Sequence, residues 1–140
     1  MDVDLKSLTY TSLARLDLEA SDLEAIHRTA RESNALEGIT GLLIFNGRHF
    51  VQIIEGSETA IDELVERLRR DRRHSGLEIR DERNVAERAF PDWSMELVRV
   101  SASYFEARET MAERLPTGIP DEVRERIFRM TESISGTVVF

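Results

Sequence analysis

Three uncharged hydrogen-bonding side chains lie in segments that the sequence predicts to be ordered. Tyr10 falls in an alternating stretch, Asn34 at the end of a helical stripe, and Gln52 in the middle of the apolar run FVQIIEG. A buried amide without a hydrogen-bond partner costs about 1–3 kcal/mol, so Gln52 must have one. An amide carries a donor and an acceptor on one fork, so rotation swaps its bonding with almost no change in shape.

Each of these residues also has an ordinary explanation. A tyrosine in a strand usually packs with its hydroxyl satisfied, an asparagine near a helix end is usually a cap or turn residue, and a strand glutamine is usually exposed. Together, however, they indicate an apolar slot between two helices, floored by a sheet. Such a slot fits a flat heteroaromatic ring with a polar imide edge, with Ile26 and Leu68 on its two faces.

Enzyme and metal-site motifs are missing from the sequence. It has no GxSxG, HExxH, P-loop or GxGxxG pattern and no cysteine. The three histidines, His27, His49 and His74, are scattered, whereas metal ligands usually come in sets. Glu55 is a general base on paper, but we expect it to cap the next helix. The sequence therefore predicts neither an enzyme nor a metal site.

Length and charge limit the class of protein. The 140 residues suffice for one domain with its own core, and the net charge of −8 disfavours nucleic acid as a partner. No apolar run approaches the roughly 20 residues that span a bilayer, and the start MDVDLKSL lacks the features of a signal peptide. Together with the lack of cysteine, this predicts a cytoplasmic location.

The arginines at 67–73 form a solvated helix end or, alternatively, a site for an anion such as pyrophosphate.

Hydrophobic periodicity predicts the elements that position these side chains. A Ser21–Glu24 capping box opens the first helix. The second helix carries Arg67 and Asp71 four residues apart, so they either pair with each other or reach a ligand. The predicted strands are 5–12, the two arms of a hairpin around Asn46-Gly47, 77–89 and 93–100; the predicted helices are 21–37, 57–71, 104–114 and 120–134.

The hairpin has apolar residues on both of its faces, so both faces need cover. Asn-Gly favours a two-residue turn, which would pair Leu43 with Phe50 and Gly41 with Gln52. Gln52 would then face a residue without a side chain, which leaves space beside its amide.

The order β-α-β-β-α-β-β matches an α+β sandwich of the ferredoxin-like type, with two extra C-terminal helices. In this topology the first strand lies beside the third, which makes Tyr10 and Gln52 neighbours on one face. We expect residues 1–100 to form the ligand-binding domain and residues 101–140 a C-terminal helical segment that covers the second face.

Several motifs, in matching order and spacing, resemble the BLUF domain, a family of blue-light sensors that use FAD. The resemblance covers roughly residues 5–100, and the last 40 residues resemble the C-terminal helices of short, single-domain members. The matching motifs are Tyr10-x-Ser12, Asn34-x-x-x-Gly38-Ile39-Thr40-Gly41, Phe50-Val51-Gln52-Ile53-Ile54-Glu55-Gly56, Asp71-x-Arg73-His74 and Arg88-x-Phe90-x-x-Trp93-Ser94-Met95.

The resemblance implies one non-covalently bound FAD whose isoalloxazine ring lies between the two helices. Ala30 and Ser33 depart from the residues that relatives often carry beside the flavin. The cofactor contacts that we expect are Tyr10, Ile26, Asn34, Gln52, Arg67, Leu68 and Asp71, and the expected photoactive residues are Tyr10, Gln52, Trp93 and Met95.

Our hypothesis is photoreception by hydrogen-bond rearrangement. After excitation of the flavin, Tyr10 gives up an electron and a proton through Gln52, and the amide ends rotated or tautomerised. The fifth strand, near Trp93 and Met95, then shifts, and the C-terminal helices or a dimer contact pass the signal to a partner protein. Two alternatives stay open: a ferredoxin-like regulatory domain without flavin, and a small enzyme that holds an anion.

Overall fold

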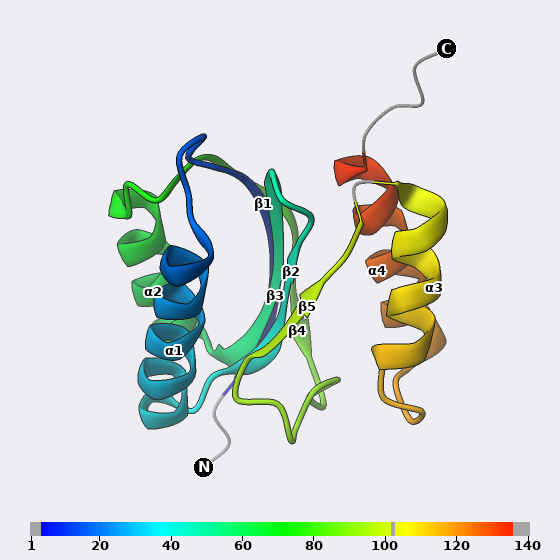
Figure 1. Ribbon diagram of the computed structural model, residues 1–140. Coiled ribbons are helices and arrows are strands. Elements are labelled where there is room, and N and C mark those ends of the chain that lie inside the picture. The colour runs from blue at the N-terminus through cyan, green and yellow to red at the C-terminus, as the bar shows by residue number, and fades with distance from the viewer. Residues whose placement is uncertain (1–3, 102, 136–140) are drawn as a thin grey trace.

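Nine helices and strands make up the described part of the chain in the computed structural model, which covers residues 4–101 and 103–135. In order they are β1 (Leu5–Ala14), α1 (Ala20–Glu37), β2 (Thr40–Phe45), β3 (His49–Ser57), α2 (Glu58–Arg70), β4 (His74–Val85), β5 (Glu96–Arg99), α3 (Tyr104–Arg114) and α4 (Asp121–Ile134). The sheet stands between two helical layers, with α1 and α2 on one side and α3 and α4 on the other (Figure 1).

The sheet has the strand order β4-β1-β3-β2-β5. β1 lies antiparallel between β3 and β4, β2 is antiparallel to β3, and β5 joins the edge parallel to β2. This confirms the predicted α+β, ferredoxin-like arrangement and its two additional C-terminal helices. It also places Tyr10 of β1 directly opposite Gln52 of β3.

The central strands bury apolar side chains on both faces, as predicted. Each face packs against two helices, because a sheet that is apolar on both sides must be shielded from water on both. On the α1–α2 face these side chains are Leu43, Phe45, Phe50 and Ile54, and on the α3–α4 face they are Leu42, Ile44, Val51 and Ile53.

The β2–β3 turn is longer than predicted. The structure pairs Leu43, rather than Gly41, with Gln52, so the predicted register is wrong by two residues. The longer loop forms because the Asn46 side-chain oxygen accepts hydrogen bonds from the backbone N–H groups of residues 48 and 49, at 3.0 and 2.7 Å. Gln52 still points to the predicted face, because a shift of two residues preserves side-chain direction.

The predicted capping box of the first helix is also displaced. α1 begins at Ala20, and the N–H group of Glu19 donates to the Asp22 carboxylate at 2.9 Å. Asp22 stands three residues after Glu19, the spacing of a capping box. The same spacing between Ser21 and Glu24 is therefore not the one that starts the helix.

Glu55 does not cap the second helix, so this prediction was wrong. Ser57 caps α2 instead, since its Oγ accepts a hydrogen bond from the first turn at 3.2 Å. The buried Glu55 carboxylate accepts bonds from the backbone N–H groups of Ala89 and Phe90, at 2.6 and 2.9 Å. These bonds hold residues 89 and 90 away from the β4 ladder, which ends at Val85 rather than at 89.

Hydrogen bonds and ion pairs fasten α4 to the sheet at its last residue and in its first half. The Asn46 side-chain nitrogen donates to the backbone carbonyl of Ile134 at 2.7 Å. Toward the other end, the buried Arg126 guanidinium pairs with Glu122 of the same helix and with Asp81 of β4. The turn between β2 and β3 thus helps to position the C-terminal helix.

Two classes of feature are absent from residues 4–101 and 103–135. No helix there combines the length and apolar character needed to cross a bilayer. No group of three or more histidine, aspartate or glutamate residues there could hold a metal ion. Residues 1–3, part of the start for which we expect no signal peptide, lie outside the described range.

The backbone of β3 passes so close to Gly41 of β2 that no side chain fits there. A Cβ atom at this position would lie 1.9 Å from the backbone oxygen of Ile53. We expect Gly41→Ala to lower the free energy of unfolding by more than about 2 kcal/mol, as measured by urea denaturation. Gly118→Ala, which points into open space, is the control and should change it by less than about 0.5 kcal/mol. Equal effects of the two variants would contradict the strand approach described here.

Candidate functional site

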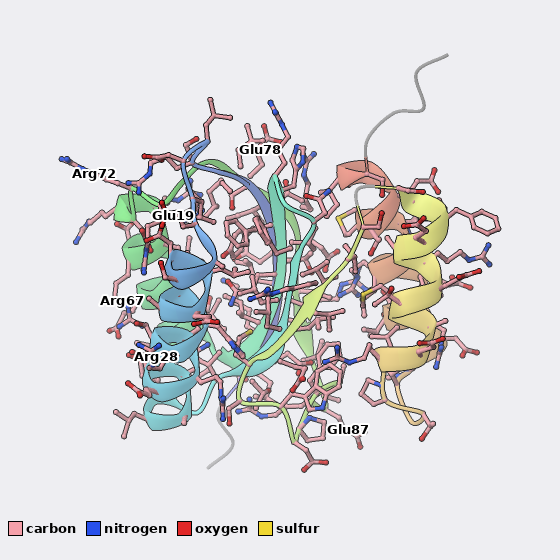
Figure 2. The ribbon with its side chains drawn as sticks, viewed as in Figure 1. Glu19, Arg28, Arg67, Arg72, Glu78 and Glu87 are labelled. Atoms are coloured by element: carbon pink, nitrogen blue, oxygen red, sulfur yellow. The ribbon has the colours of Figure 1, made fainter. Side chains whose placement is uncertain are left out.

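A pocket of about 270 Å³ opens between α1, α2 and the sheet face that carries Tyr10 and Gln52. Strands β1, β2 and β3 supply its floor, and the two helices supply its walls. Arg67 is labelled in Figure 2 on the helical layer that borders it. The lining includes all seven residues predicted from the sequence to contact a cofactor: Tyr10, Ile26, Asn34, Gln52, Arg67, Leu68 and Asp71.

The Gln52 amide is bonded on both sides. The Tyr10 hydroxyl donates to Oε1 of Gln52, and Nε2 of Gln52 lies 3.3 Å from the sulfur of Met95, to which it donates. All three side chains are buried. Since a thioether sulfur accepts hydrogen bonds but has no proton to give, Met95 favours the orientation in which the amide nitrogen faces it.

Tyr10 stays protonated over the whole physiological pH range. Burial raises the pKa of its hydroxyl well above the ordinary value, and the negative charge of Asp71 raises this pKa further. The hydroxyl therefore serves as a hydrogen-bond donor to Gln52.

Asn34 is a buried amide without a partner in the protein. Its side chain is fully buried at the wall of the pocket. Neither Nδ2 nor Oδ1 has a hydrogen-bond partner among the described residues. Because such groups are rarely left unpaired, this amide indicates a ligand that offers both a donor and an acceptor.

Arg67 and Asp71 do not pair with each other. Arg67 forms two hydrogen bonds to Glu37 at the end of α1, at 2.8 and 3.1 Å. Asp71 accepts bonds from the side chain of Arg73, the shortest at 2.6 Å. The possibility that they pair with each other is therefore wrong, and both residues line the pocket.

Other pocket-lining residues were not named as contacts from the sequence. Leu43 and Phe50 share the face of Gln52, so strand alternation could have identified them, and Leu64 lies one helical turn before Leu68. Thr29 has no such signal. His74, the first residue of β4, also lines the pocket, where its ring nitrogens lie 2.8 Å from Oγ of Ser12 and 2.7 Å from the backbone oxygen of Leu68.

The two residues predicted to be photoactive on the fifth strand lie on opposite sides of the sheet. Met95 packs with the cluster under α1 and α2 and contacts Gln52. Trp93 packs on the α3–α4 side, where its ring stacks on Phe90 at 5.3 Å between centroids. Both precede β5, which begins at Glu96 rather than at 93 as predicted.

A comparison with family models shows to which family the chain belongs. A model described as BLUF, sensors of blue light using FAD, matches residues 5–96. The chain belongs to the BLUF family. It is therefore a blue-light photoreceptor module whose cofactor is FAD, and the family is defined by sensing rather than by catalysis.

Curated relatives of this BLUF chain are much longer proteins. Photoactivated adenylate cyclase subunit beta of Euglena gracilis is 38% identical over 95 residues, which are 67% of this chain and 11% of that protein. The blue light- and temperature-regulated antirepressor BluF of Escherichia coli (strain K12) is 34% identical over 70 residues, which are 50% of this chain and 17% of the relative. The match thus spans a small fraction of the length of these relatives.

Two solved BLUF structures match over nearly their full length. The dark-state structure of BlrB, a BLUF protein, is 39% identical with a TM-score of 0.73, and the match covers 95% of this chain and 99% of that one. The BlrP1 BLUF structure is 28% identical with a TM-score of 0.80, over 97% and 93% of the two chains.

The pocket of this BLUF chain fits a flavin. The unpartnered donor and acceptor of Asn34 match the alternating N–H and C=O groups of a flavin's imide edge. Ile26 and Leu68 line the pocket from opposite helices with apolar surface, which is the surface that the faces of a flat ring require.

Asp71 provides a test of the charges at the pocket. Burial by itself would raise the pKa of its carboxyl, but the hydrogen bonds and charge of Arg73 outweigh burial and lower it. The ionised Asp71 carboxylate therefore stabilises the folded protein at pH values above about 3.9, the ordinary pKa of the group. This contribution to stability is lost as the pH falls through the lower pKa that the group has in the folded state.

We expect Arg73→Gln to raise the pKa of Asp71 relative to the unaltered protein, because the guanidinium that lowers this pKa is removed while the burial that raises it stays. Carboxyl NMR titration measures it. Arg72→Gln is the matched control, since Arg72 points away from the protein (Figure 2) and should leave this pKa unchanged. The described pairing is wrong if both variants leave the Asp71 titration unaltered.

Proposed function

We propose that Tyr10, Gln52 and Met95 form the light-operated switch of this photoreceptor. The observation that carries the proposal is the continuous line of hydrogen bonds from Tyr10 through the Gln52 amide to Met95. This chain of hydrogen bonds starts at Tyr10 and Gln52, which both border the pocket, and ends at Met95, one residue before β5. It therefore connects the cofactor pocket to the edge of the sheet.

FAD, when bound, supplies absorption of blue light and a group that accepts an electron. Ile26 and Leu68 hold its ring by apolar contact, and Asn34 bonds its polar edge. Arg67 and Asp71 contribute further polar contacts from α2. Each of these roles is supported by the position of the residue on the pocket and by the family resemblance.

The two orientations of the Gln52 amide differ in their partners. In the described orientation, Tyr10 donates to Oε1 and Nε2 donates to Met95. If the amide turns over, Nε2 faces the Tyr10 hydroxyl, which then accepts, while Oε1 faces a sulfur that cannot donate. The turned-over arrangement lacks one hydrogen bond to the protein, so we expect it to revert in the dark.

The change reaches the surface through β5. This strand has four residues and, within the described chain, pairs with β2 alone. We propose that residues 101–140, whose helices α3 and α4 pack on the sheet, form the output segment, which passes the signal to a partner protein or across a homodimer contact. Relatives named photoactivated adenylate cyclases support an effector protein as the partner, and we propose a cytoplasmic location.

A substitution of Asn34 should have opposite effects on the affinity for FAD and on the stability of the flavin-free protein. Asn34→Leu removes a buried amide that lacks a protein partner, so we expect the flavin-free protein to gain about 1 kcal/mol in unfolding free energy. The same change should weaken FAD binding about tenfold or more. Urea denaturation and flavin fluorescence titration measure the two effects, with Asn84→Leu, at an exposed position of β4, as the matched control. Unchanged affinity in Asn34→Leu would exclude the proposed contact.

Tyr10 and Gln52 carry the light response itself. We expect Tyr10→Phe and Gln52→Leu to bind FAD but to lose the reversible red shift of flavin absorption under blue light, because each removes one end of the Tyr10–Gln52 bond. Tyr104→Phe changes the chain's other tyrosine, on α3, and should keep the shift. A normal shift in either pocket variant would refute the proposed switch.

A further inference from the structure

The backbone of Met95 is bonded to a helix that borders the pocket. Nε2 of His27, in α1, lies 2.8 Å from the carbonyl oxygen of Met95, 68 positions further along the chain. A carbonyl can only accept, so the imidazole must donate, which requires a proton on Nε2. This contact joins the helix that carries Ile26 and Asn34 to the segment just before β5.

Met95 lies just before a short strand at the edge of the sheet. β5 begins one residue later, is four residues long, and has β2 as its only strand neighbour in the described chain. Two residues before Met95, the carbonyl of Trp93 accepts a hydrogen bond from Gly41 at 2.9 Å. At such a short edge strand, one hydrogen bond from a helix contributes much of the restraint on the backbone.

We propose that His27 is a positioning residue for the switch: by holding the Met95 carbonyl, it keeps the Met95 sulfur against the Gln52 amide. The inference rests on the proposed Tyr10–Gln52–Met95 switch. His27 is not part of the pocket lining, so it acts through Met95 rather than by contact with the cofactor.

The position of the sulfur controls how strongly the described amide orientation is favoured. Gln52 donates to this sulfur at 3.3 Å, and the turned-over amide has no corresponding bond. If the His27 contact is lost, Met95 moves away more readily and the two orientations come closer in free energy. The light-adapted state should then return to the dark state more slowly.

Three variants test this role. His27→Leu removes the donor, His27→Gln keeps an N–H donor on a flexible side chain, and Arg28→Leu is an exposed control on the same helix, labelled in Figure 2. Two measurements are made: the rate of dark recovery after a blue-light pulse, and the ¹³C-methyl NMR spectrum of methionine in the dark. The spectrum contains its own controls, since Met111 and Met130 lie in α3 and α4.

We expect His27→Leu to slow dark recovery about three-fold or more and to shift the Met95 methyl resonance, with Met111 and Met130 unchanged. His27→Gln should restore both values toward those of the unaltered protein, which a general loss of stability would not do. A His27→Leu variant that behaves like Arg28→Leu in both measurements would overturn the proposal.

The unaltered protein provides a second test that does not depend on the folding of a variant. Imidazole ¹⁵N NMR in the dark should show His27 with a proton on Nε2, and a neutral ring protonated on Nδ1 alone would overturn the proposal. Failure of the switch itself is distinguishable, because the unaltered protein would then bind no flavin or show no reversible red shift. A normal light response without any effect of His27→Leu contradicts the role of His27 alone.

Discussion

The structure depends on an amide held between two unequal partners. Tyr10 has a hydroxyl, which both donates and accepts, so it can bond either end of the Gln52 amide. Met95 has a sulfur, which accepts only. The amide consequently has a preferred orientation, favoured by a weak hydrogen bond of about 1 kcal/mol or less. A difference of this size gives a defined resting state and leaves the other orientation within reach of a stimulus.

Such a balance requires the exclusion of water, and the fold provides it. An exposed amide would exchange its protein partners for solvent, so Gln52 must lie inside a sheet that is covered on both faces. The strand order β4-β1-β3-β2-β5 places β3 in the middle of the sheet with β1 beside it. Tyr10 of β1 therefore lies opposite Gln52 of β3. α1 and α2 leave a pocket over this pair, while α3 and α4 cover the opposite face. The C-terminal helices thus protect the same sheet from which, in our proposal, they receive the signal.

The element order and the residues that surround the pocket could be predicted because their signals are local or topological. The apolar stripes predicted the helices, and the apolar runs around Asn46-Gly47 predicted the two hairpin strands. The ferredoxin-like order of these elements then placed Tyr10 beside Gln52. The hairpin register could not be predicted, because the Asn46 side chain competes for the backbone N–H groups of the turn. The partners of Glu55 and Arg67 were missed because they lie about 30 residues away in the chain, beyond any spacing rule. The contact between His27 and Met95 could not be predicted from the sequence either, because it depends on how a helix packs against the edge of the sheet.

The central claim is that light changes the bonding of one side-chain amide. Gln52 is the only glutamine in the sequence, so a glutamine label with ¹⁵N in the side-chain amide reports on this residue alone. NMR of the labelled, FAD-loaded protein should show the Gln52 amide resonances move under blue light and return in the dark at the rate of the visible absorption. Amide resonances that stay in place while the flavin absorption shifts and recovers would contradict the account.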